Sequence, residues 1–156
     1  MGGGFIENYD ERGVYQLEKA GRQLVRFDGM QYEGETGRRT VTPTDIDGYI
    51  EVGGEAFVLF ELKHHGKMPV GQRKALTRLA DAIEESGRDV VVFLAEHQTP
   101  EGEDVVAKDA EVTGIYLGSR YNGRWVCREH PRKLGDEIEN FLKWVREGKH
   151  ERQRPG

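Results

Sequence analysis

Two residues of types that do acid–base and metal chemistry stand close together at the end of one apolar run. Glu61 follows the run Ala56 to Phe60, and Lys63 comes two residues after it. Successive side chains of a strand alternate between its two faces, so a strand here places Glu61 and Lys63 on one face. A carboxylate is costly to bury without a partner. The pattern therefore indicates a site, although Glu-x-Lys also occurs on exposed strands as a solvated pair.

A second carboxylate is expected opposite Glu61. Asp47 lies in the preceding strand candidate, residues 46–52, and a Gly-Gly turn separates the two strands. If the turn comprises residues 53–55, Asp47 faces Glu61 across an antiparallel pair. A two-residue turn would put the two acids on opposite faces of the sheet. Because facing carboxylates repel each other, the hairpin predicts a positive charge between them, from Lys63 or from a divalent cation.

Two carboxylates and a lysine suit hydrolysis of a phosphodiester. Mg²⁺ prefers a few carboxylates together with water and phosphate oxygens. A bound divalent cation polarises the phosphate and lowers the pKa of the attacking water. Lys63 can orient that water or stabilise charge in the transition state. The site offers oxygens and no thiol, so we expect Mg²⁺ or Mn²⁺ as cofactor, in preference to Zn²⁺.

The stretch Asp-Ile-Asp, Gly, apolar strand and Glu-Leu-Lys resembles the PD-(D/E)xK, or restriction-endonuclease-like, nuclease superfamily. In that family the Asp and the Glu hold Mg²⁺ and the Lys assists the water. The resemblance covers residues 8–95. It implies that Asp47 and Glu61 are metal ligands and that Lys63 is catalytic.

Three further residues come under consideration through the same resemblance. A Gln early in the helix after the Glu-x-Lys strand matches Gln72, and an acid on the first helix matches Glu18. The motif proline is displaced, because Pro43 precedes Asp45 by two residues. Asp45 and Asp47 therefore compete as the metal ligand, and we prefer Asp47. Asp45 has the alternatives of pairing with Lys63 or accepting hydrogen bonds in a turn.

Hydrophobic periodicity predicts the elements that position these residues. Helices are expected at residues 8–26, at 71–86 and from residue 134, the second with Ala75, Leu76, Leu79, Ala80 and Ile83 on one face. Strands are expected at 46–52, 56–63, 90–95, 113–117 and 124–127. Residues 29–43 read as a loop with room for a short strand. The order predicts an α/β fold, a mixed central β-sheet flanked by helices.

Length and composition indicate one small domain. The 156 residues suit a single core over residues 8–148, between loose ends at 1–7 and 149–156. Cys127 is the only cysteine, which excludes an internal disulfide and a multi-cysteine zinc site. The sequence shows neither a long apolar segment nor a secretory signal, and a reducing cytoplasm is the expected location. The net charge of −5 argues mildly against nucleic acid, but carboxylates that bind metal contribute to it.

The sequence leaves three functions open. The first is a Mg²⁺-dependent deoxyribonuclease, in which a homodimer is one way for a single site to cut both strands. The second is a catalytically idle module of the same fold that binds nucleic acid or a protein partner. The third, another phosphoryl-transfer enzyme, is weakened because the chain has no Walker loop. His64 and His65 are adjacent, so on a strand they cannot easily chelate one zinc ion, and they indicate DNA contact or simple exposure.

Overall fold

The computed structural model describes residues 31–40, 46–65, 67–121 and 123–152. The chain divides into two units, residues 1–44 with 100–104, and residues 45–99 with 105–156, and each is described by itself. The helix predicted at residues 8–26 lies outside the described residues. The two candidate ligands Glu18 and Asp45 also lie outside them.

In the first unit, residues 31–40 form a two-stranded hairpin. Strands β1 (Gln31–Gly34) and β2 (Gly37–Thr40) pair antiparallel, and Gly37 supplies the positive φ of the turn. The sequence had indicated a loop with a short strand here. The structure gives two strands instead of one.

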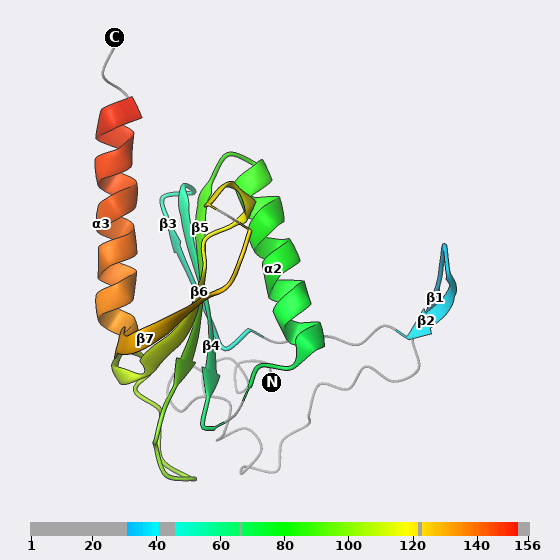
Figure 1. The fold of residues 1–156 in the computed structure, drawn as a ribbon, viewed down its shortest axis with the longest axis horizontal. Coiled ribbons are helices and arrows are strands. Elements are labelled where there is room, and N and C mark those ends of the chain that lie inside the picture. The colour runs from blue at the N-terminus through cyan, green and yellow to red at the C-terminus, as the bar shows by residue number, and fades with distance from the viewer. Residues whose placement is uncertain (1–30, 41–45, 66, 122, 153–156) are drawn as a thin grey trace, which may run out of the picture. The chain divides into compact units, whose positions relative to one another are not determined.

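The second unit contains a five-stranded mixed sheet in the order β3-β4-β5-β6-β7 (Figure 1). Only β4 and β5 run parallel; the other neighbours are antiparallel. The strands are β3 (Gly48–Val52), β4 (Ala56–Lys63), β5 (Asp89–Glu96), β6 (Glu111–Tyr116) and β7 (Val126–Lys133). Two helices, α2 (Val70–Glu85) and α3 (Leu134–Arg152), and two short 3-10 helices, η1 (Ala107–Asp109) and η2 (Ser119–Tyr121), complete the unit. The predicted α/β class with a mixed sheet is confirmed.

The helix α2 connects the two parallel strands, as a parallel pair requires. Pro69 precedes its first residue, and Gly87, with a φ of +84°, follows its end. Of the residues predicted to share one face, Leu76 and Ala80 are buried and Leu79 is 40% exposed. The part of the helix that meets the sheet is therefore narrower than the apolar stripe.

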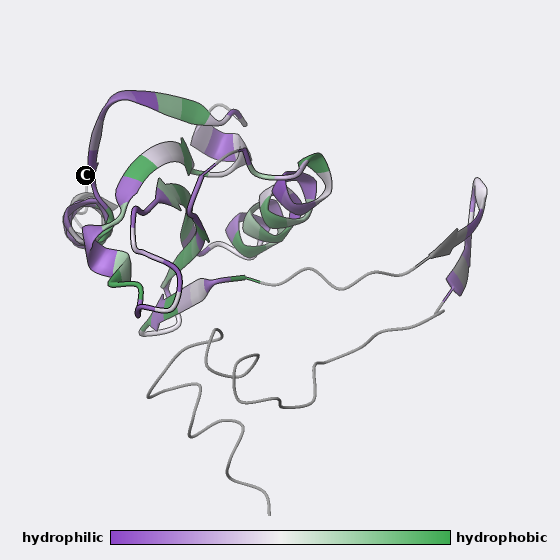
Figure 2. Ribbon diagram, turned by 90° about the horizontal axis from the view of Figure 1, so that it is seen from below, coloured by the Kyte–Doolittle hydropathy of each residue, from purple (hydrophilic) through white to green (hydrophobic). Residues whose placement is uncertain are grey.

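The sheet has a hydrophobic core on each face. One core joins α2 to the sheet through Leu59, Leu76, Ala80, Val90, Val92 and Tyr116. The other joins α3 to the opposite face through Val58, Val91, Phe93, Ile115, Leu134, Phe141 and Val145. Figure 2 shows hydrophobic strand segments between helices that carry both hydrophobic and hydrophilic residues. Among the described residues, no helix has the length and apolar character needed to cross a membrane.

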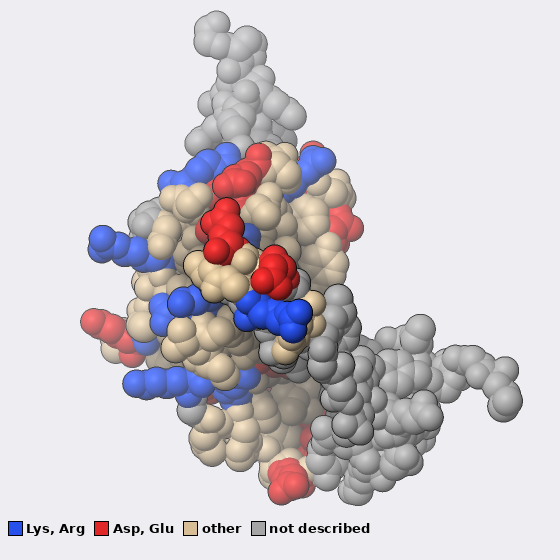
Figure 3. Space-filling model, turned by 90° about the vertical axis from the view of Figure 1, so that its right-hand side faces the viewer, with Lys and Arg blue, Asp and Glu red and all other residues tan. Residues whose placement is uncertain are grey.

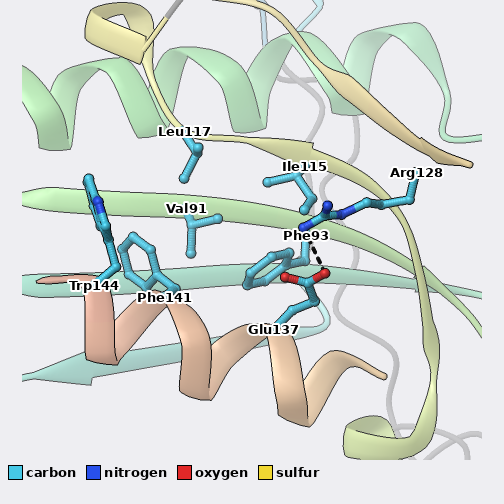
Figure 4. Close-up of a pocket in the computed structure, with 8 residues that line it drawn as sticks. All are labelled: Val91, Phe93, Ile115, Leu117, Arg128, Glu137, Phe141 and Trp144. Atoms are coloured by element: carbon cyan, nitrogen blue, oxygen red, sulfur yellow. Dashed lines mark ion pairs between the residues drawn. The ribbon is translucent and has the colours of Figure 1, made fainter. Parts of the chain in front are cut away.

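A pocket lies between helix α3 and the sheet, beside the exposed strand β7. All residues of β7 are exposed, and its pairing with β6 shifts register between Val112 and Gly114. The pocket has a volume of about 200 Å³ and walls that include Phe93, Phe141 and Trp144 (Figure 4). At its edge the buried carboxylate of Glu137 pairs with Arg128 at 2.8 Å. The helix continues to Arg152, three residues past Lys149, where the C-terminal tail was expected to begin.

A buried acid ties α2 to the segment before β7. Glu84 is 3% exposed, and its carboxylate accepts hydrogen bonds from the Ser119 hydroxyl at 2.8 Å and the Arg120 backbone N–H at 3.1 Å. The Arg120 guanidinium pairs with it at 3.1 Å. Burial alone raises the pKa of Glu84, but these hydrogen bonds and the arginine charge outweigh it and hold the pKa below its usual value. Gly118 leaves space for this carboxylate, because a Cβ at position 118 would lie 2.7 Å from it.

Glu84→Gln should lower the free energy of unfolding by about 1–3 kcal/mol at neutral pH, because it removes the charge that three donors surround. A lowered pKa gives stability above the unfolded-state pKa, and that stability is lost as the pH falls through the folded-state pKa. The difference from wild type should therefore shrink in acid. Urea unfolding of both proteins at neutral pH and in acid measures this difference in the free energy of unfolding. Glu85→Gln, the exposed neighbour, is the control, and an equal loss there would contradict the assignment.

Candidate metal and phosphate site

The β3–β4 hairpin has the register that a three-residue turn predicts. Val52 pairs with Ala56 and Gly48 with Phe60, and the turn glycines Gly53 and Gly54 have φ values of +62° and +67°. Asp47 directly precedes the first paired residue, and Glu61 directly follows the last. The structure thus brings the predicted Asp and Glu to one end of the hairpin.

The glycine after Asp47 is required by its partner across the hairpin. A Cβ at Gly48 would lie 1.8 Å from an atom of the Phe60 ring. The ring therefore occupies the space above the glycine, and no larger residue fits without moving Phe60. The contact holds β3 against β4 at Gly48 and Phe60, the residues next to Asp47 and Glu61.

Asp47 is exposed, but its carboxylate is anchored to the neighbouring strand. Oδ2 accepts a hydrogen bond from the backbone N–H of Leu62 at 2.7 Å. Leu62 is the residue between Glu61 and Lys63, so the bond holds Asp47 against the middle of the Glu-Leu-Lys segment. The anchor leaves Asp47 with lone pairs for a further ligand.

Glu61 is 2% exposed and is paired with Lys63. Both side chains belong to the face of β4 that meets α2. Lys63 Nζ donates to Glu61 Oε1 and also to Gln72 Oε1, the latter at 3.3 Å. Glu61 Oε2 is buried and makes no hydrogen bond of normal geometry to the described residues. The predicted residues Glu61, Lys63 and Gln72 therefore form one polar cluster at the start of α2.

The surroundings of Glu61 disfavour its charge. Burial is the main reason that the pKa of Glu61 is raised, and the negative charge of Asp47 raises it further. The contacts of Lys63 and Gln72 act in the opposite direction and reduce the shift. A cation beside the two acids would remove both causes of the raised pKa, because it replaces lost hydration and cancels the repulsion.

The oxygen donors fit a hard divalent cation. Glu61 Oε2 lacks a hydrogen-bond donor, and Asp47 supplies a second carboxylate nearby. Within the described ranges, no group of three His, Cys, Asp or Glu side chains is placed to hold a metal ion. Mg²⁺ commonly uses one or two carboxylates and completes its shell with water and phosphate oxygens, so two acids are enough.

Three histidines lie near the carboxyl ends of β4 and β5. The rings of His64 and His65 have centroids 4.4 Å apart, and those of His64 and His97 are 5.3 Å apart. His97 was not among the residues predicted for the site, because it stands 32 residues from His65 in the sequence. The parallel pairing of β4 and β5 is what brings His97 close to His64. Lys63 and Glu96 are register partners, and each is followed by a histidine.

Comparisons with known proteins add no assignment. No protein-family model, curated protein or solved structure matches the chain.

Glu61→Gln should make the protein more stable at neutral pH, by on the order of 1 kcal/mol, because a site held for function is often costly to stability. A raised pKa gives stability that is full below the unfolded-state pKa and is lost as the pH rises through the folded-state pKa. The advantage of the variant should therefore grow with rising pH and vanish in acid. Thermal unfolding across that range tests it.

Glu129→Gln, in exposed strand β7, is the matched control and should change little at any pH. A Glu61→Gln variant that is less stable than wild type at neutral pH, by a difference that shrinks in acid, would show that the buried carboxylate is stabilised as an anion.

Proposed function

We propose that this protein is a metal-dependent phosphodiester hydrolase that acts on DNA. Asp47 and Glu61 are its metal ligands, and Lys63 is the catalytic residue that stabilises charge in the transition state. One observation carries the proposal. A buried carboxylate with an unbonded oxygen lies beside a second carboxylate, a lysine and a glutamine, and three separate segments of the chain supply them. Perturbed acids of this kind cluster at functional sites.

Mg²⁺ or Mn²⁺ would be held by Asp47 Oδ1 and Glu61 Oε2, the oxygens left free by the anchoring contacts. When bound, the ion supplies Lewis acidity toward the phosphate and lowers the pKa of water. Asp47 stays oriented by the Leu62 N–H, and Glu61 stays oriented by Lys63. Both carboxylates must be ionised, so binding of the ion releases protons at low pH.

Lys63 is suited to the developing charge on the phosphate. Its side chain is 24% exposed, so the residue lies at the boundary between the buried Glu61 and solvent. Gln72 accepts one of its three donors, which fixes the direction of Nζ. A fixed ammonium beside the phosphate stabilises the transition state more than the ground state.

The described residues near the site offer local contacts to phosphates. On the face seen in Figure 3, Lys and Arg side chains are interspersed with Asp and Glu. Near the start of α2, Arg73 lies over the Trp125 ring at 5.2 Å and is exposed. We infer that contacts near the site, rather than the net charge of −5, hold the DNA.

A second function has one observation in its favour. At the proposed metal site the described residues provide only two carboxylates, those of Asp47 and Glu61. Lys63 already pairs with Glu61. This arrangement also suits a catalytically idle module of the same fold that binds nucleic acid or a protein partner. The two functions predict different results for Mn²⁺ binding and for the effect of Lys63→Ala on DNA cleavage.

Calorimetry with Mn²⁺ should show binding by the wild-type protein. The affinity should fall at least tenfold in Asp47→Ala and in Glu61→Ala, because each removes one of two charged ligands. Asp81→Ala is the control, since Asp81 lies on α2 and hydrogen-bonds Tyr116 at 2.6 Å. Equal affinity in wild type and Asp47→Ala would exclude the metal site.

Lys63→Ala should keep Mn²⁺ binding and lose about 10²–10³ in cleavage rate, the usual cost of deleting one transition-state donor. The assay is nicking of supercoiled and branched DNA with Mg²⁺ or Mn²⁺, with Glu61→Ala as the inactive reference. Lys67→Ala, an exposed lysine four residues on, is the matched control. If wild type binds DNA without cleaving it under any divalent ion, the binding module replaces the nuclease.

A further inference from the structure

The pocket between α3 and the sheet lies on the sheet face opposite to Glu61 and Lys63. Those two residues belong to the face that α2 covers, whereas Val91 and Phe93 of β5 pack toward α3. The volume of the pocket is about 200 Å³. An apolar cavity of about 150 Å³ admits a benzene molecule. The pocket therefore has room for one aromatic ring with a small substituent.

The walls of the pocket are mainly apolar and aromatic. Phe141 and Trp144 of α3 stand together, with ring centroids 5.9 Å apart, and Figure 4 shows them on the side of Val91 away from Glu137. Phe93 adds a third ring from the sheet. Trp144 is 39% exposed, so the aromatic end of the pocket reaches the protein surface. Such walls suit a ring-shaped ligand, because aromatic rings pack favourably edge-to-face or offset.

One carboxylate interrupts these apolar walls. The Glu137 side chain is 6% exposed, and its Oε1 lies 2.8 Å from a guanidinium nitrogen of Arg128. This contact lacks the geometry of a hydrogen bond, and no other donor among the described residues reaches the oxygen. A buried carboxylate is costly unless donors replace the water that it has lost. Glu137 therefore offers a ligand in the pocket an acceptor that the described part of the chain leaves unused.

Arg128 determines which charge the ligand can carry. It belongs to the segment of β7 between the paired residues Cys127 and Arg132, where the β6–β7 register shifts. Its guanidinium compensates the charge of Glu137 from the edge of the pocket (Figure 4). A cationic ligand would be repelled by Arg128, and an anionic ligand would be repelled by Glu137. A neutral molecule with a hydrogen-bond donor meets neither repulsion.

We propose that this pocket binds a neutral one-ring molecule that carries a hydroxyl or N–H group. The ring packs against Phe93, Phe141 and Trp144, and the donor bonds to Glu137 Oε1. The inference is independent of the proposed hydrolase activity, because the two sites lie on opposite faces of the sheet and share no residue. It gives the protein a second site, for a small organic ligand.

The test is an NMR titration with p-cresol, toluene and p-toluate, which carry a hydroxyl, a hydrogen and a carboxylate opposite the same methyl group. The chain has two tryptophans, so two indole N–H signals report on two places. Trp144 lines the pocket, and Trp125 packs on the opposite face. p-Cresol should shift the Trp144 signal saturably and leave Trp125 unmoved. Toluene should bind at least about tenfold more weakly, the loss expected of one hydrogen bond to a charged group. p-Toluate should bind no better than toluene.

Three variants locate the site. Glu137→Met keeps an unbranched side chain without the acceptor, and should lower the affinity for p-cresol to that for toluene. Glu139→Met, at an exposed position of α3, is the matched control and should bind p-cresol as wild type does. Leu117→Phe enlarges a side chain of the pocket wall and should weaken the binding of both neutral ligands.

The absence of a saturable shift at Trp144, or equal affinity for p-cresol and toluene, overturns the inference. Tighter binding of p-toluate also overturns it, because Arg128 would then be the recognition group. Wild-type affinity for p-cresol in Glu137→Met or in Leu117→Phe does the same. If Glu137→Met does not fold, the three ligands on wild type and the Leu117→Phe variant still decide.

Discussion

The charge of Glu61 is the constraint on which the site depends. A carboxylate in the apolar strand β4 can ionise only if nearby groups replace the water that it has lost. Lys63 on the same face and Gln72 from α2 supply part of that replacement, while Asp47 works against it. The balance leaves one oxygen unbonded in the protein interior. Such a balance is costly in a purely structural residue and useful in one that meets a cation.

The rest of the unit can be understood as support for that one residue. The β3–β4 hairpin brings Asp47 to the strand, and the parallel strand β5 protects the other edge of β4. Helix α2 covers the face that carries Glu61 and Lys63, and Glu84 at its far end locks it to Ser119 and Arg120. The helix is therefore held at both ends, by Lys63 to Gln72 and by the Glu84 network.

Local patterns predicted the parts of the fold that local residues determine. Strand alternation and the Gly-Gly turn predicted the β3–β4 register, and apolar spacing predicted α2, α3 and the central strands. Contacts between distant segments escaped prediction. Glu84 reads as one more acid in a polar helix, and only the fold brings Ser119 and Arg120 to it. His97 and Lys63 became neighbours in the same way, because the pairing of β4 with β5 decides which residues meet.

The site itself was predictable to the extent that its members are close in sequence. Glu61 and Lys63 are two residues apart, and Asp47 is joined to them by one turn. Gln72 depended on a resemblance, and Leu79 showed that an apolar stripe does not reveal how wide a helix contact will be. Glu18 and Asp45, the two other predicted metal ligands, lie outside the described residues.

The contact of Gly48 with the Phe60 ring has a consequence for how this chain can change over evolutionary time. Because the ring fills the space that a side chain at 48 would need, the two positions share one fixed volume. A larger residue at 48 is admissible only with a smaller one at 60, so related chains should vary at these positions in opposite senses. The acids at 47 and 61 are the immediate neighbours of that pair. An exchange of volume between positions 48 and 60 is therefore acceptable only if it leaves in place the backbone on which both acids stand.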